Sequence, residues 1–237
     1  METDLKILQG HSDLEKGAYL GAIASIASAD RSATQEEVEY LSDLCDSAEL
    51  SAPQKAAVIH AADEVSGQDL TRCLDILKSS NLKYSLVTDL MSFAKSDGDY
   101  TEDEKQNIEK IAQYLGVNEH QTSLLDEFSD KAVNTDAPPE EIAHPDFLSS
   151  LGLGDKMKSA GINGGGLLKS LLGIAAPLIL TGMVSRGLRG GSGGGIFGGG
   201  NQIGGGGLGS IIGMLSGGRG MANTGGLFGR IFGGNNR

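Results

Sequence analysis

The chain has 237 residues, a formal net charge of −12, 39% hydrophobic residues and two cysteines. This length accommodates one domain of ordinary size and an extension. Two cysteines exclude a disulfide framework of more than one bridge, and the acidic balance argues against direct binding of nucleic acid, whose phosphates attract Lys and Arg.

Charge and glycine content divide the sequence near residue 148. Residues 1–148 hold 11 Lys and Arg against 30 Asp and Glu, whereas residues 149–237 hold 8 against 1. Of the 37 glycines, 31 lie in the second part. Two physically different parts are therefore joined, one acidic and one basic and rich in glycine.

The first residues have no basic start followed by a long apolar run, so we expect no secretory signal and a cytoplasmic protein. Cys45 and Cys73 do not form a CxxC pair, and we predict two reduced, buried thiols. From residue 12 onward, apolar residues recur at spacings of three and four, which is typical of amphipathic helices. The pattern predicts helices over 12–29, 35–48, 52–64, 68–78, 82–96, 102–115 and 119–129. No alternating strand pattern occurs before residue 148, so the predicted fold class is all-α.

The sequence repeats itself in this region. The aligned pairs are Asp30 and Asp97, Ser32 and Asp99, Thr34 and Thr101, Glu37 and Glu104, Leu41 and Ile108, and Leu44 and Ile111. Helix starts with capping-box spacing are Thr34-x-x-Glu37, Ser51-x-x-Gln54, Thr101-x-x-Glu104 and Asn118-x-x-Gln121. We predict a compact bundle of about seven helices, built from two similar halves that share one core.

One acidic turn stands out. The stretch from Ser96 to Glu104, SDGDYTEDE, holds five carboxylates and one glycine just before a predicted helix. Its start has the spacing of an EF-hand loop, but position six is Glu rather than Gly and position twelve is Ile rather than Glu, so an EF-hand is excluded. Two interpretations remain. Either the carboxylates only cap the helix and interact with its dipole, or Asp97, Asp99 and Glu104 converge on a hard cation.

The corresponding turn in the first copy is a weaker candidate. Asp30 and Glu37 persist there, but Arg31 replaces the glycine and Ser32 replaces the second aspartate. The Arg31 guanidinium can neutralise Asp30, which disfavours a metal ion at this turn.

The segment from Ala94 to Glu104 follows an apolar helix and has the pattern A-x-x-D-G-x-x-[ST]-x-x-E, which resembles the TerB-like domain. That family includes tellurite-resistance proteins and the N-terminal region of the membrane co-chaperone DjlA. The resemblance covers roughly residues 12–130. It implies an all-α fold of two similar halves, a non-enzymatic role in stress response, and acidic residues that bind divalent metal. By position these residues are Asp97 and Glu104, with Asp30 and Glu37 in the first copy.

No catalytic constellation is present. The four histidines, His11, His60, His120 and His144, lack the spacing of metal ligands, and no Ser-His-Asp or Cys-His arrangement can be argued from the sequence. We therefore expect a protein that is not an enzyme. The expected cofactor is a divalent cation, which is calcium, magnesium or zinc.

The region after the acidic domain is read from its composition. We predict an acidic domain over 1–133, a linker over 134–165, an apolar helical segment over 166–189 and a largely disordered Gly-rich tail over 190–237. The uncharged run 170–185 has 16 residues and contains Pro177, whereas a membrane-spanning helix needs about 20. Either this run spans a membrane with Lys169 snorkelling, or it docks on a membrane surface or on a copy of itself.

Small apolar islands interrupt the glycines of the tail, at 196–197, 208–215 and 227–232. Such islands suit weak multivalent contacts, a lipid surface or self-assembly, and the arginines among them favour lipid headgroups or the acidic domain of a neighbouring copy. Two functions follow. The first is a stress-response module that the tail recruits to a complex or to the inner face of the membrane. The second is a structural protein that self-assembles through its tail.

Overall fold

The computed structural model describes residues 6–27, 35–63, 68–96, 100–133, 139–142, 144 and 146–172. Helices and connecting turns make up these residues, and no strand occurs among them, which confirms the all-α class. The helices are α1 (Asp13–Ala27), α2 (Gln35–Ser47), α3 (Ala52–Asp63), α4 (Gln68–Leu77), α5 (Leu82–Ser96), α6 (Glu102–Tyr114), α7 (Glu119–Val133), α8 (Pro139–Ile142), α9 (Asp146–Ser150), α10 (Gly154–Ser159) and α11 (Gly164–Ser170).

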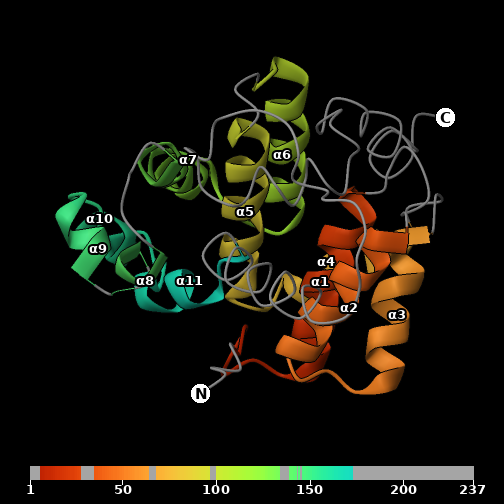
Figure 1. Cartoon of the computed structure of the whole chain (residues 1–237). Helices are drawn as coiled ribbons and strands as arrows, with labels where there is room; N and C mark the ends of the chain where they lie inside the picture. Colours follow the sequence, from red (N-terminus) through yellow and green to blue (C-terminus); the bar gives the residue numbers. More distant parts are fainter. Residues whose placement is uncertain are drawn as a thin grey trace, which may run out of the picture.

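The first seven helices are those that the apolar spacing predicts. Their ends differ from the predicted ends by at most two residues, except that α7 continues to Val133. They divide into two similar halves, because α1 packs on α3 and contacts α2, and α5 packs on α7 and contacts α6. The fourth helix packs on α1, and α1 contacts α5, so the halves share one core (Figure 1).

The turns that end α2 and α6 match in detail. The residues at equivalent positions of the repeat, Glu49 and Gly116, have positive φ angles of 58° and 73°. In each turn the next amide reaches back over the last helical turn, as Leu50 N–H donates to Cys45 O at 3.0 Å and Val117 N–H to Ala112 O at 2.9 Å. These are Schellman motifs, which satisfy carbonyls that the helix leaves free. Their agreement supports a duplicated unit rather than two unrelated helix pairs.

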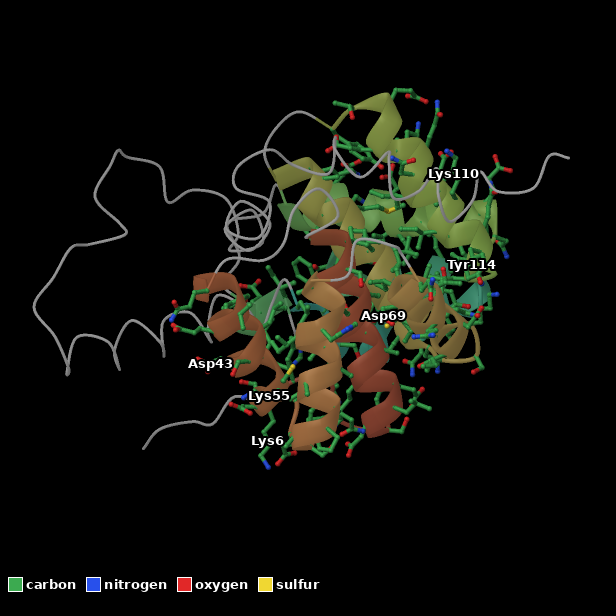
Figure 2. The ribbon with its side chains drawn as sticks, turned by 90° about the vertical axis from the view of Figure 1, so that its right-hand side faces the viewer. Lys6, Asp43, Lys55, Asp69, Lys110 and Tyr114 are labelled. Atoms are coloured by element: carbon green, nitrogen blue, oxygen red, sulfur yellow. The ribbon has the colours of Figure 1, made fainter. Side chains whose placement is uncertain are left out.

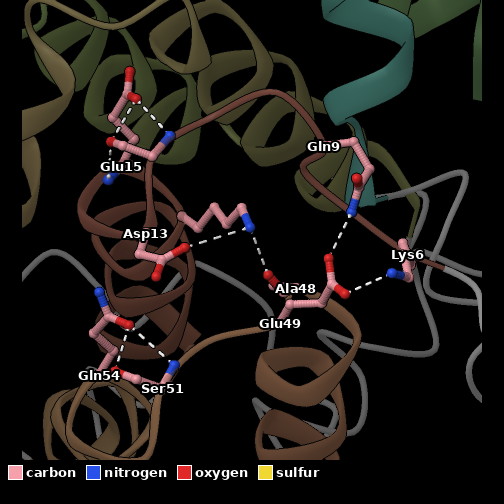
Figure 3. A network of polar contacts seen from close by, with 10 residues as sticks. Lys6, Gln9, Asp13, Glu15, Ala48, Glu49, Ser51 and Gln54 are labelled. Atoms are coloured by element: carbon pink, nitrogen blue, oxygen red, sulfur yellow. Dashed lines mark hydrogen bonds and ion pairs between the residues drawn. The ribbon is translucent and has the colours of Figure 1, made fainter.

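Glu49 occupies a backbone conformation that glycine adopts more readily. Its carboxylate accepts from Lys6 Nζ at 2.6 Å and from Gln9 Nε2 at 3.4 Å (Figure 3). These two bonds, on the surface, join the segment before α1 to the end of α2. Close by, the nearly buried Lys16 donates to Ala48 O at 2.8 Å, which satisfies one more carbonyl at that helix end.

Side chains cap the helix starts as the sequence predicts. Gln54 accepts from the backbone N–H of Ser51 at 3.0 Å, and Gln121 accepts from that of Asn118, also at 3.0 Å. The predicted cap at Thr34 lies outside the described residues. A further box with the same spacing begins α1, where Glu15 accepts from the Ser12 amide at 2.9 Å (Figure 3). This box is additional to the four predicted helix starts, although its S-x-x-E spacing is visible in the sequence.

The two halves also meet through polar contacts at the surface. Tyr114, at the end of α6, lies beside α4 (Figure 2). Its hydroxyl donates to Asp75 Oδ1 at 2.8 Å, and Lys78 Nζ lies 3.7 Å from the centre of its ring. A cation over an aromatic face is attracted by the ring quadrupole, so these contacts hold the end of α6 against α4.

The core extends beyond residue 133. Phe147 packs edge-to-face on Phe128 of α7 with ring centroids 6.4 Å apart, and Met157 and Leu168 are buried in the same core. The sequence predicts a linker over 134–165, because Pro138, Pro139 and Pro145 interrupt the helical pattern. The short helices α8, α9 and α10 lie within this range, however, and residues 146–162 contribute buried side chains to the core.

The apolar segment predicted over 166–189 is described only up to residue 172. Its first part belongs to α11, and Leu167, Leu168, Leu171 and Leu172 are buried. The remainder and the Gly-rich tail over 190–237 lie outside the described residues. Within the described part of the chain, no helix combines the length and the apolar character that crossing a bilayer requires.

A buried carboxylate joins the halves to this C-terminal extension. Asp89 of α5 is 1% exposed and accepts from the hydroxyl of Tyr19 on α1 and from the amide of Leu172 at 3.0 Å. Burial, followed by the charge of Asp89 and its hydrogen bond, raises the pKa of Tyr19. The tyrosine therefore stays protonated and remains a donor, as a buried carboxylate needs.

Acid stability should depend on Glu15. Hydrogen bonds from Ser80 and then from Ser12 lower the pKa of its carboxyl to about 2, whereas a glutamate in an unfolded chain titrates near about 4.3. The pKa of Glu15 is lower in the folded chain than in the unfolded chain, so the ionised carboxylate stabilises the fold. This stabilisation is complete above the pKa of the unfolded chain and is lost as the pH falls toward the pKa of the folded chain.

The variant Glu15→Gln keeps an acceptor for the capping box but removes the titration. Thermal unfolding of both proteins between about pH 5 and pH 2 should show the native chain losing stability more steeply than the variant. Parallel pH profiles would contradict this assignment.

Candidate functional site

The site begins at the start of α6, directly after the acidic turn. Thr101 is extended, with φ −76° and ψ 158°, and its hydroxyl accepts from the Glu104 amide at 3.3 Å. In return, Glu104 Oε2 accepts from the Thr101 amide and hydroxyl, both at 2.8 Å. Two backbone donors are thus satisfied reciprocally. Glu104 is 2% exposed, so this carboxylate is held in one place.

The structure places only part of the predicted metal site. Of its five residues, Glu104 is described in full, and Glu37 lies on α2 with its side chain outside the description. Asp30, Asp97 and Asp99 lie outside the described residues. Where side chains are described, no three His, Cys, Asp or Glu residues are grouped closely enough to hold a metal ion. The metal site therefore stays a prediction.

Glu104 has a geometry that serves both interpretations of the acidic turn. All of its capping bonds end on Oε2, and Oε1 takes no part in the box. A carboxylate can accept through both oxygens. Glu104 can therefore cap the helix through Oε2 and still offer Oε1 as a ligand to a cation.

Lys95 is a charged residue of the site that the sequence did not indicate. Its ammonium lies 2.7 Å from Asp126 Oδ1 and 2.6 Å from Asp130 Oδ1, and its side chain is 10% exposed. These bonds fix the end of α5 to α7. The two aspartates are four residues apart and so share one face of α7, but their distance from Lys95 in the sequence hid the contact.

Tyr100 lies within the acidic turn, two residues before α6 begins at Glu102. Burial, and after it the charges of Asp126, Glu109, Glu104 and Asp130, raise the pKa of its hydroxyl. These carboxylates make the surroundings of Tyr100 negative, and Lys95, which lies 5.5 Å from the ring centre, offsets part of that charge. Such a potential favours cations.

A groove runs beside this tyrosine, between α6 and α7, and has a volume of about 460 Å³. We call it the α6–α7 groove. It is lined by Met91, Tyr100, Lys105, Glu109, Gln113, Val117, Glu119, Thr122, Ser123 and Asp126. Met91 and Val117 are almost fully buried and give it an apolar floor, while carboxylates from both helices line its sides. The groove therefore suits a ligand that is both apolar and cationic.

A second groove, of about 410 Å³, lies in the first half among α1, α3 and α4. It contains Cys73, whose thiol has a pKa raised to about 12 by burial and, less strongly, by Asp69. Burial has the main part in raising the pKa of Cys45 to about 12 as well. Both cysteines are free, as predicted, but only Cys45 is buried, whereas Cys73 is partly exposed. Thiols that remain protonated are poor nucleophiles.

Comparison with known proteins identifies one family. The family model described as tellurite resistance protein TerB matches residues 17–127. The matched range runs from α1 into α7 and includes both halves of the repeat. No curated protein and no solved structure shows significant similarity to the chain.

Three variants separate the capping role of Glu104 from a role of its charge. Thr101→Ala and Glu104→Ala should each lower the free energy of unfolding by about 1 kcal/mol, because each removes half of the box. Glu104→Gln should cost much less, since an amide oxygen also accepts from the Thr101 amide. Urea denaturation of the full chain without divalent cations measures all three. Equal losses in Glu104→Gln and Glu104→Ala would show that the charge, and not the cap, stabilises the fold.

Proposed function

Residues 17–127 form a TerB domain, and from this premise we propose that the chain is a non-enzymatic stress-response module that binds a divalent cation at its second acidic turn. The observation that carries the proposal is the position of Glu104. Its carboxylate is buried and fixed at the helix start that follows Asp97 and Asp99 in the sequence.

The local charges support a cation at this turn. A helix N-terminus carries a partial positive charge, so carboxylates must outweigh it before a cation binds. Lys95 is neutralised by Asp126 and Asp130, whereas Lys105 directly follows Glu104 on α6. The carboxylates of the turn are therefore not cancelled by Lys95.

The donor set favours calcium or magnesium over zinc. Carboxylate oxygens are the ligands that calcium and magnesium prefer, whereas zinc sites are usually completed by His or Cys. The sequence from Ser96 to Glu104 contains neither His nor Cys. In the first copy, Arg31 follows Asp30, so we propose one site in the second half rather than a matched pair.

The tail gives the module a means of recruitment. We propose that the basic, Gly-rich extension brings the acidic domain to a membrane face or into a complex, because its arginines and apolar islands suit anionic and apolar surfaces. Self-assembly through the same islands is the alternative, and it would make the chain a scaffold.

Titration calorimetry of the full chain with calcium, magnesium and zinc tests the cation proposal. We expect binding of calcium or magnesium, its loss in Asp97→Asn/Asp99→Asn, and weaker binding in Glu104→Gln, which keeps the cap. Bound cation should also raise the melting temperature of the native chain but not that of the double variant.

The matched control is Asp43→Asn/Asp155→Asn, which removes one carboxylate from α2 and one from α10 and leaves the acidic turn unchanged. It should bind like the native chain. Unchanged binding after Asp97→Asn, Asp99→Asn and Glu104→Gln are combined would overturn the proposed site, and no binding by the native chain would leave the acidic turn with a capping role alone.

A further inference from the structure

In the α6–α7 groove, carboxylates without an ion-pair partner among the described residues lie above a floor of buried apolar side chains. Met91 and Val117 are each 2% exposed and form its floor. Glu109 of α6 and Glu119 of α7 line it, and neither forms an ion pair within the described part of the chain. The third carboxylate, Asp126, is already bound by Lys95. One cation, Lys105, also lines the groove, so its remaining charge is negative.

The C-terminal part of the same chain has the complementary chemistry. Residues 173–237 contain five arginines, no lysine and no Asp or Glu. Only one of its apolar islands combines aromatic side chains with an arginine, namely 227–232, Leu-Phe-Gly-Arg-Ile-Phe. The island at 208–215 has neither an aromatic residue nor an arginine, and the one at 196–197 has no arginine.

We propose that residues 227–232 dock in the α6–α7 groove of their own chain. Phe228 and Phe232 would enter the groove beside Tyr100, above the buried Met91 and Val117, and the Arg230 guanidinium would lie between Glu109 and Glu119. Aromatic side chains bury large areas and dominate such contacts, while the ion pairs fix the orientation. The proposal does not depend on cation binding at the acidic turn.

The length of the intervening chain permits this docking. Leu172 is bound to Asp89 on α5, and the same helix provides Met91 two residues later. The 54 residues from 173 to 226 would span roughly 40 Å as a flexible coil, whereas a domain of this size has a radius of gyration of about 16 Å. Tethering gives the segment a high effective concentration at the groove, which offsets the entropy lost when a Gly-rich segment becomes ordered.

The absence of tryptophan from the chain makes the test direct. In the full chain, Phe232→Trp introduces a single reporter. We expect blue-shifted emission and protection from acrylamide that is independent of protein concentration and weakened by salt. Adding Glu109→Lys/Glu119→Lys should lower the docking equilibrium constant about 5-fold or more, since exposed ion pairs are lost. Adding Arg230→Glu to that variant should restore part of the protection.

The matched control, Asp43→Lys/Asp155→Lys, makes the same change in net charge elsewhere on the described surface and should leave the emission unchanged. Circular dichroism and melting temperature verify that each variant is folded. Three results would overturn the proposal. The first is equal protection of the tryptophan from acrylamide with and without Glu109→Lys/Glu119→Lys. The second is protection that appears only at high protein concentration. The third is emission typical of an exposed tryptophan that shifts only when phosphatidylserine vesicles are added.

Discussion

The buried carboxylate of Asp89 is the contact on which the arrangement of the described chain depends. It lies in the middle of α5 and binds one group from each of the other parts, the Tyr19 hydroxyl from the first half and the Leu172 amide from the C-terminal extension. A carboxylate removed from water is costly unless donors surround it. The two halves and the extension therefore have to meet at this point, and the place where the tail leaves the domain is fixed by the same contact.

Elsewhere in the described chain, the same kinds of capping motif recur at the ends of the helices. Side-chain caps begin α1, α3, α6 and α7, and Schellman turns end α2 and α6 at equivalent positions of the repeat. The caps place carboxylates and amides at helix starts, so the acidic turns are in part a consequence of how this bundle is built. The second turn differs from the first in having Gly98 and Asp99 where the first has Arg31 and Ser32, and it ends on a buried glutamate with one oxygen outside the cap. We therefore expect a functional site at a turn that carries more carboxylates than helix capping requires.

The helices and caps could be predicted because they are encoded locally. Apolar residues three and four apart gave helices with nearly the observed ends, and S/T/N-x-x-E/Q spacing gave the caps. The contacts of Lys95 with Asp126 and of Asp89 with Leu172 could not be predicted, since they join residues far apart in sequence and leave no periodic signal. The linker was predicted over 134–165 because the prolines at 138, 139 and 145 interrupt the helical pattern, and only tertiary packing shows that the short helices of this range belong to the core. For the metal site, the sequence pattern predicted five ligand residues. The structure describes only Glu104 among them in full, so the site stays a prediction.

Hydrogen exchange of the full chain, comparing Asp89→Ala with the native protein, tests most directly that one core reaches residue 172 through this carboxylate. The account predicts that the variant loses about 1–3 kcal/mol of unfolding free energy, because buried donors are left without an acceptor, and that the Leu172 amide and α11 exchange faster than α6. Tyr19→Phe should leave the Leu172 amide better protected than Asp89→Ala does. Native-like protection of Leu172 together with unchanged stability in Asp89→Ala would contradict the account.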